Sequence, residues 1–172
     1  INFNISQLCP YKCSYCMAGH AFLDNLTLVP TKDQLLNALE NLKNNFSDSF
    51  LSIHVTGGGE PTFIPDFPMF ISTLLDMPFV YDVFLITNLY RPIDWYSFLI
   101  DHPNCHKLSI VSTLHESQYD NVDMFINKAL YLNANKLSLD VQIIMTNDNY
   151  DRVASIIKYV SETYGINIAC RL

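Results

Sequence analysis

The chain has 172 residues, of which 49% are hydrophobic and 16% carry a charge, and its formal net charge at pH 7 is -7. This length predicts one domain with a sizeable core. The acidic balance argues against nucleic acid or an anionic membrane surface as the main partner, and no apolar run approaches the roughly 20 residues of a membrane-spanning helix. The low share of charged residues indicates a sheet covered on both faces and a surface that meets another domain.

Hydrophobic periodicity predicts strands and helices that alternate along the chain. The predicted strands are Ile1–Ser6, Leu51–Val55, Tyr81–Thr87, Lys107–Thr113, Leu137–Met145 and Ile166–Cys170. The predicted helices are one that follows a capping box of Thr31 and Gln34 and carries Leu35, Leu39, Leu42 and Phe46 on one face, then Asp66–Met77, Ile93–Asp101, Val122–Leu132 and Asp151–Thr163. Such alternation favours an α/β fold of parallel strands joined by right-handed crossovers. The pattern fits both an open doubly wound sheet and a partial barrel.

Three cysteines follow the first predicted strand with the spacing C-x3-C-x2-C: Cys9, Cys13 and Cys16. Three clustered thiolates in a chain with no visible secretion signal indicate metal ligands rather than disulfides. They suit a [4Fe-4S] cluster in which one iron lacks a protein ligand and stays open to a small molecule. The alternative is a structural zinc ion with His20 as its fourth ligand.

A run of three glycines follows the second predicted strand in the segment Thr56-Gly57-Gly58-Gly59-Glu60-Pro61. The whole chain has only five glycines, so this concentration needs a reason. Glycine at a strand end lets backbone groups approach a ligand closely, and Glu60 offers a carboxylate for a cationic group. The alternative is an ordinary tight turn.

Further polar residues follow the third, fourth and fifth predicted strands. They are Thr87, Asn88, Ser112, Thr113, His115, Thr146 and Asn147. The carboxyl ends of parallel strands meet at one edge of the sheet, where α/β folds build their sites. The sequence therefore predicts one site at this edge, although short polar residues in such positions also serve as loop caps.

The cysteine motif with the aromatic Tyr15 before its last cysteine, followed by the Gly-Gly-Glu segment after the second strand, resembles the signature of the radical S-adenosylmethionine (radical SAM) superfamily. The resemblance runs in element order over essentially all 172 residues. It implies a partial (β/α)6 TIM-like barrel of parallel strands whose final helix is missing. We therefore expect residues 1–172 to form a radical SAM core domain that is an excised or truncated part of a longer protein.

The resemblance also implies the cofactors and where they bind. Cys9, Cys13 and Cys16 would hold a [4Fe-4S] cluster. S-adenosylmethionine would bind to Tyr15, Gly57, Gly58, Gly59, Glu60, Asn88, Ser112 and His115, with its amino group along the glycine run and its adenine beside Tyr15. No catalytic residue is assigned beyond the cluster ligands. The segment Met145–Asn149 lacks the glycine that often follows the fifth strand in this family.

The implied reaction is homolytic. The reduced cluster would cleave S-adenosylmethionine to methionine and a 5′-deoxyadenosyl radical, which abstracts a hydrogen atom from an unidentified substrate. The expected partners are that substrate, an electron donor such as flavodoxin or ferredoxin, and a C-terminal region of the same protein. We expect a cytoplasmic enzyme that binds neither membrane nor nucleic acid. The alternative is a non-catalytic interaction module stapled by zinc or by a cluster.

Overall fold

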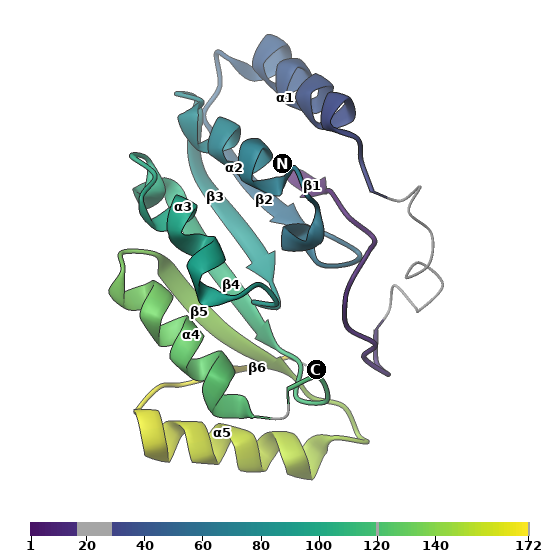
Figure 1. Ribbon diagram of the computed structural model, residues 1–172, viewed down its shortest axis with the longest axis vertical. Coiled ribbons are helices and arrows are strands. Elements are labelled where there is room, and N and C mark those ends of the chain that lie inside the picture. The colour runs from purple at the N-terminus through teal and green to yellow at the C-terminus, as the bar shows by residue number, and fades with distance from the viewer. Residues whose placement is uncertain (17–28, 120, 172) are drawn as a thin grey trace.

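The structure is a computed structural model that describes residues 1–16, 29–119 and 121–171 (Figure 1). The described residues contain one sheet of six strands. The strands are β1 (Asn2–Asn4), β2 (Leu51–Thr56), β3 (Val80–Thr87), β4 (Leu108–Leu114), β5 (Ser138–Ile144) and β6 (Ala169–Arg171). The helices are α1 (Lys32–Phe46), α2 (Phe67–Asp76), α3 (Ser97–Ile100), α4 (Val122–Ala134) and α5 (Tyr150–Tyr164), with short 3-10 helices η3 (Pro61–Phe63), η4 (Ile93–Tyr96) and η5 (Cys105–Lys107).

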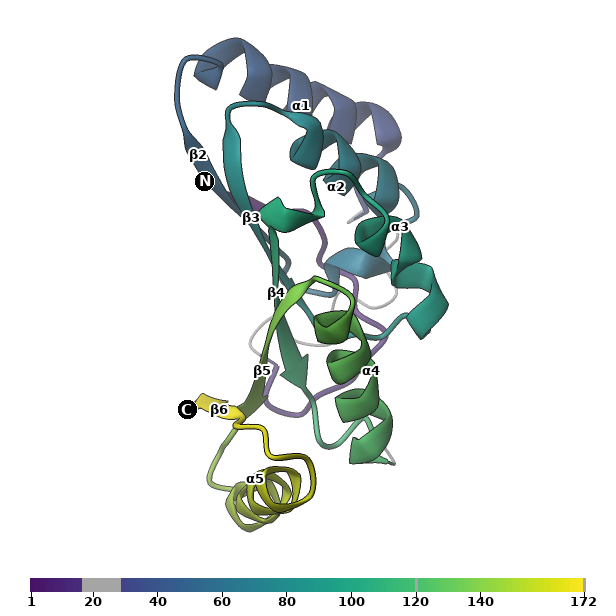
Figure 2. The same ribbon diagram turned by 90° about the vertical axis from the view of Figure 1, so that its left-hand side faces the viewer.

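The order of the strands in the sheet decides between the two architectures that the alternation allowed. Neighbouring strands follow the chain order from β1 to β6, and every neighbouring pair is parallel. A doubly wound sheet would instead reverse its order at a switch point. Helices α1 to α4 lie on one side of the curved sheet (Figure 2). The fold is therefore the expected partial TIM-like barrel of parallel strands.

The core lies between the sheet and this layer of helices. In β2 and β3 the alternate residues Ile53, Val55, Val83 and Leu85 are fully buried, because successive side chains of a strand point to opposite faces. The residues between them lie on the other face of the sheet, where the rings of His54 and Phe84 are 4.9 Å apart. Each buried aliphatic side chain stabilises the fold by about 1.5–3 kcal/mol. One face of the sheet thus carries the core and the other faces the barrel interior.

Helix α1 begins where the sequence predicts. The Thr31 hydroxyl accepts a hydrogen bond from the N–H of Gln34 (3.2 Å), and the Gln34 side chain accepts one from the N–H of Thr31 (2.8 Å). This capping box confirms the predicted start of the helix. Phe46, expected on its apolar face, is instead 40% exposed, because it lies in the last turn beyond the packed core.

Several predicted bounds differ from the observed ones. The predicted helix Ile93–Asp101 is the 3-10 helix η4 followed by the single turn α3. The predicted strand Ile1–Ser6 is regular only over β1, although the carbonyl of Ile1 and the N–H of Ile5 still bond to β2, at 2.8 and 3.0 Å. The last strand begins later than predicted, at Ala169, where it meets β5.

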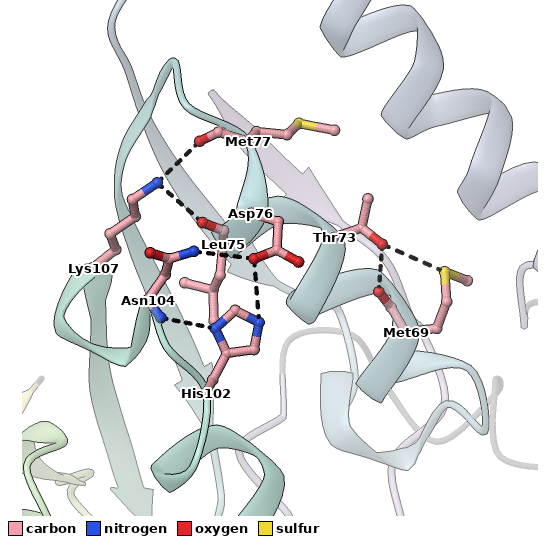
Figure 3. Close-up of polar contacts among 8 residues, drawn as sticks. All are labelled: Met69, Thr73, Leu75, Asp76, Met77, His102, Asn104 and Lys107. Atoms are coloured by element: carbon pink, nitrogen blue, oxygen red, sulfur yellow. Dashed lines mark hydrogen bonds and ion pairs between the residues drawn. The ribbon is translucent and has the colours of Figure 1, made fainter.

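Polar side chains at the amino ends of β3 and β4 close the end of helix α2 (Figure 3). The Lys107 ammonium donates to the carbonyl oxygens of Leu75 and Met77, each at 3.0 Å. The Asn104 amide donates to Asp76 Oδ1 (3.0 Å), and Asn104 N–H donates to the His102 ring (3.1 Å). A cation at a helix C-terminus complements the helix dipole, so this cluster stabilises the fold.

None of the helices in residues 1–16, 29–119 and 121–171 is both long enough and apolar enough to span a membrane.

Candidate functional site

A cavity of about 560 Å³ lies at the carboxyl ends of the strands. Its wall joins the cysteine loop, the glycine run and the ends of β3, β4 and β5. The predicted site residues on this wall are Cys9, Cys13, Tyr15, Cys16, Gly57, Gly58, Gly59, Glu60, Asn88 and His115. The fold therefore brings ten of the eleven predicted site residues to one cavity, from segments up to about a hundred positions apart.

Ser112 is the predicted residue that does not line the cavity. Its side chain is fully buried, and its hydroxyl donates to the carbonyl oxygen of Asp140 (3.0 Å). The next residue, Thr113, lines the cavity instead. Successive side chains of a strand point to opposite faces of the sheet. A prediction that is wrong by one position therefore selects a residue that faces the core instead of one that faces the cavity.

The glycine run packs directly against the segment that leads into the cysteine loop. A Cβ atom on Gly57 would lie 2.6 Å from the carbonyl oxygen of Ser6, and one on Gly59 would overlap the carbonyl group of Leu8. Glycine is therefore required at both positions by the neighbouring backbone. The glycine run and the cysteine loop are one packed unit.

The glycine run offers acceptors rather than donors to a ligand. Three N–H groups of this segment are already used: those of Gly58, Gly59 and Glu60 donate to Asn4 Oδ1 (3.0 Å), Ser6 O (3.0 Å) and Leu8 O (2.7 Å), respectively. A phosphate-binding loop needs free N–H groups that point at the anion. Among the described residues, no backbone N–H donates to the carbonyl oxygens of Gly57, Gly58 or Gly59, and free carbonyl oxygens suit an ammonium group.

The carboxylate of Glu60 is turned into the protein. The side chain is 2% exposed. It accepts hydrogen bonds from Thr62 N (3.0 Å) and Oγ1 (2.6 Å), from Thr87 Oγ1 (2.7 Å) and from Asn88 N (2.7 Å). Burial raises the pKa of this carboxyl, while the four donors act in the opposite direction. Glu60 thus joins the ends of β2 and β3, and its carboxylate is not turned toward a ligand.

Tyr15 and His115 form a stacked pair at the wall of the cavity. Their rings are 6.0 Å apart and nearly parallel at 18°. The Tyr15 hydroxyl lies 3.0 Å from His115 Nδ1 and donates to Glu116 Oε2 (3.3 Å). Burial lowers the pKa of His115 to about 4, although the nearby Glu116 acts in the opposite direction. His115 is therefore neutral at pH 7.

Two residues that the sequence analysis did not assign help to shape the site. Glu116 is only 4% exposed and accepts a hydrogen bond from the Asn149 amide (3.3 Å), so it ties the cysteine loop to the segment before α5. Tyr11 lines the cavity, and its ring meets those of Tyr90 and Tyr119 edge-on at 6.0 and 5.9 Å. The position of Tyr11 between two motif cysteines was the only available signal for it.

The three motif thiols line the same cavity but do not converge on a single point. Burial raises the pKa of the Cys9 thiol to about 11, with smaller contributions from Glu60, Cys13 and Cys16. Within the described ranges, no set of three His, Cys, Asp or Glu side chains could hold one metal ion. Sulfurs on one zinc ion would lie about 3.8 Å apart. A cube-shaped cluster binds each cysteine to a different iron, so its three cysteines need not surround one metal ion.

The zinc alternative also needs His20, which lies outside the described residues. Its other three ligands, Cys9, Cys13 and Cys16, lie among the described residues.

Comparisons with known proteins agree with this geometry. The sequence model of the radical SAM superfamily matches residues 3–169. An S-adenosylmethionine-dependent nucleotide dehydratase of Selenomonas ruminantium is 26% identical over 174 aligned positions, which cover 91% of this chain and 60% of that protein. A GTP 3′,8-cyclase of Acidothermus cellulolyticus is 28% identical over 89 residues, which cover 51% of this chain and 25% of that protein.

Solved structures show the same fold. One, native anSMEcpe with bound AdoMet, has a TM-score of 0.71 at 15% identity, and the match covers 98% of this chain and 50% of that one. A second, native anSMEcpe with bound AdoMet and Cp18Cys peptide, has a TM-score of 0.70 at 16% identity, with 98% and 49% covered. The chain thus spans at most 60% of the length of these relatives. Because the family model covers nearly the whole chain, the chain belongs to the radical SAM superfamily, whose enzymes use a [4Fe-4S] cluster and S-adenosylmethionine.

Proposed function

We propose that this chain is the core domain of a radical SAM enzyme, with Cys9, Cys13 and Cys16 as the ligands of its cluster. The observation that carries the proposal is the single cavity that these cysteines share with the glycine run. When bound and reduced, the cluster supplies the electron that cleaves S-adenosylmethionine to methionine and a 5′-deoxyadenosyl radical. The other tasks fall to the protein.

The first task is to orient the methionine end of the cofactor. The glycine run offers carbonyl oxygens, because the N–H groups of Gly58, Gly59 and Glu60 are used within the protein. Carbonyl oxygens accept hydrogen bonds from an ammonium group, which matches the amino group of S-adenosylmethionine. Gly57, Gly58 and Gly59 are therefore its proposed binding residues, and the buried side chain of Glu60 fixes the end of the run.

The second task is to hold the adenosyl end and to exclude water. Tyr15 and His115 offer a stacked aromatic surface on one wall of the cavity. Ile86, Ile144 and Met145 add apolar side chains to the cavity lining. An apolar surrounding protects a reactive carbon radical from side reactions.

The chain carries the part of the activity that relatives with different substrates share. Two relatives are named for nucleotides, and one solved neighbour was bound to a peptide. We infer that substrate selection belongs to a C-terminal region of the same protein and that residues 1–172 form the radical SAM core. An electron donor such as flavodoxin or ferredoxin would reduce the cluster. Free thiol ligands suit a reducing compartment such as the cytoplasm.

Anaerobic reconstitution of the chain tests the proposal. Iron analysis should give about four irons per chain. Addition of a reductant and S-adenosylmethionine should then release 5′-deoxyadenosine, measured by chromatography. A protein that binds one zinc ion, takes up no iron and yields no 5′-deoxyadenosine would instead be the zinc-stapled interaction module.

A further inference from the structure

Cys9 receives a hydrogen bond from a side chain that lies far away in the sequence. The Asn88 amide nitrogen Nδ2 is 3.7 Å from Cys9 Sγ and donates to it. The backbone N–H of Tyr11 is a second donor to the same sulfur, at 3.4 Å. Asn88 follows strand β3, whereas Cys9 lies in the loop after β1, so the contact joins two separate walls of the cavity.

The orientation of the Asn88 amide is fixed by its other end. The oxygen Oδ1 accepts a hydrogen bond from the N–H of Tyr90 at 2.9 Å. Only the oxygen of a side-chain amide can accept such a bond, so the two ends of the amide cannot be exchanged. The NH₂ group must therefore face the sulfur of Cys9.

The backbone at Asn88 is held just as firmly. Its N–H donates to the buried carboxylate of Glu60 at 2.7 Å. The next residue, Leu89, is fully buried and has φ +51°, a left-handed conformation that costs a non-glycine residue about 1 kcal/mol or more. The Tyr119 hydroxyl, at 3.2 Å, lies within hydrogen-bonding distance of both the Asn88 and the Leu89 carbonyl oxygens. The Lys128 ammonium donates to the Leu89 carbonyl at 2.6 Å. This strained turn is thus stabilised from three sides, with the Asn88 amide pointing at the thiol.

We propose that Asn88 tunes the reduction potential of the cluster through this hydrogen bond to the thiolate of Cys9. The inference rests on the proposed function, because it takes Cys9 as a cluster ligand. A hydrogen bond to a ligand sulfur stabilises negative charge, and the reduced cluster carries one more negative charge than the oxidised one. Asn88 therefore favours the reduced state and makes the first electron transfer easier.

The substitution Asn88→Asp tests this directly. An aspartate keeps an oxygen for the Tyr90 N–H but replaces the donor by a second oxygen beside the sulfur. In the reconstituted protein we expect the ratio of reduced to oxidised cluster at a fixed potential to fall about tenfold, which is ~59 mV for one electron. The measurement is a redox titration followed by electron paramagnetic resonance.

Asn45→Asp is the matched control. Asn45 is exposed on helix α1, and its substitution adds the same charge away from the cavity. We expect its titration to match that of the unchanged protein. Equal potentials in Asn88→Asp, Asn45→Asp and the unchanged protein would overturn the proposal.

A second measurement decides the matter if Asn88→Asp does not retain its cluster. The unchanged protein is labelled with ¹⁵N in the asparagine side-chain amides only, and its reduced cluster is studied by pulsed electron–nuclear double resonance. A ¹⁵N coupling to the cluster supports the hydrogen bond, and its absence overturns it. Failure of the proposed function would look different: the unchanged protein itself would hold no iron–sulfur cluster or release no 5′-deoxyadenosine.

Discussion

The two ends of strands β3 and β4 both carry clustered polar groups, but the groups at the two ends differ in what they contact. At the amino ends, Asp76, Asn104 and Lys107 bond to one another or to the last carbonyls of helix α2 (Figure 3). At the carboxyl ends, thiols and glycine carbonyls face a cavity, and Leu89 adopts a strained conformation. Clustered polar residues alone do not mark a site. Polar groups that face a cavity beside a strained backbone turn are better evidence for a site.

The largest expected difference between the two ends comes from their cysteines. Cys13→Ala removes a proposed cluster ligand and should abolish both iron retention and 5′-deoxyadenosine formation. Cys105→Ala changes the same atoms in η5, at the amino ends, and should leave both unchanged. Iron analysis and chromatography on the reconstituted proteins measure the effect. Equal iron content in the two variants would show that Cys13 is no more important than Cys105 for holding iron.

Substitution of a glycine should cost more stability where the backbone is packed against a neighbouring segment than where it faces open space. Gly59→Ala places a Cβ atom on the Leu8 carbonyl group and should lower the free energy of unfolding by about 3 kcal/mol. It should also weaken S-adenosylmethionine binding. Gly165→Ala, where φ is +67° but the space is open, should cost only about 1 kcal/mol and leave binding unchanged. Urea unfolding and calorimetry measure both. A smaller loss of stability for Gly59→Ala than for Gly165→Ala would contradict the proposed packing.

The buried His115, at the carboxyl ends, should make the free energy of unfolding depend on pH. The pKa of His115 is lowered to about 4 in the native state, below its ordinary 6.5. As the pH falls from 6.5 toward 4, the unfolded chain takes up a proton that the native state does not, so the free energy of unfolding falls. Between pH 7 and 5 we expect the unchanged protein to lose about 2 kcal/mol more than His115→Asn.

Urea unfolding at both pH values measures this difference. His106→Asn is the control, because His106 is exposed at the amino ends, and it should keep the pH dependence of the unchanged protein. Identical pH profiles for His115→Asn and the unchanged protein would argue against a buried neutral imidazole.

The smallest expected effects come from two lysines that bind backbone carbonyls at opposite ends. Lys107→Met and Lys128→Met should each lower the free energy of unfolding by about 1 kcal/mol, since each removes a pair of hydrogen bonds from a charged donor. Only Lys128→Met should also shift the potential of the cluster, because Lys128 supports the turn at Leu89. An equal shift of the cluster potential in Lys107→Met would contradict the expectation that only the carboxyl-end lysine affects the cluster.

The sequence was enough to predict the elements and the edge of the sheet at which the site lies. The cysteine spacing and the glycine run are local signals, and the alternation of strands and helices placed both at carboxyl ends. The choice between Ser112 and Thr113 depended on the phase of β4, which hydrophobicity specifies poorly where both faces are covered.

The role of Glu60 was not visible in the sequence either. Its carboxylate meets Thr87 and Asn88 across about 28 positions of chain, and no local pattern reports such a contact. The contribution of Glu116 could not be predicted for the same reason, since its partners Tyr15 and Asn149 come from two other segments. Side-chain directions that depend on long-range partners are set by the fold as a whole.

The backbone bonds that join Gly59 and Glu60 to Ser6 and Leu8 have a consequence for cofactor assembly. They anchor the entrance of the cysteine loop to the segment after β2 through peptide groups alone. The protein should therefore hold Cys9 close to the glycine run before any cluster is assembled.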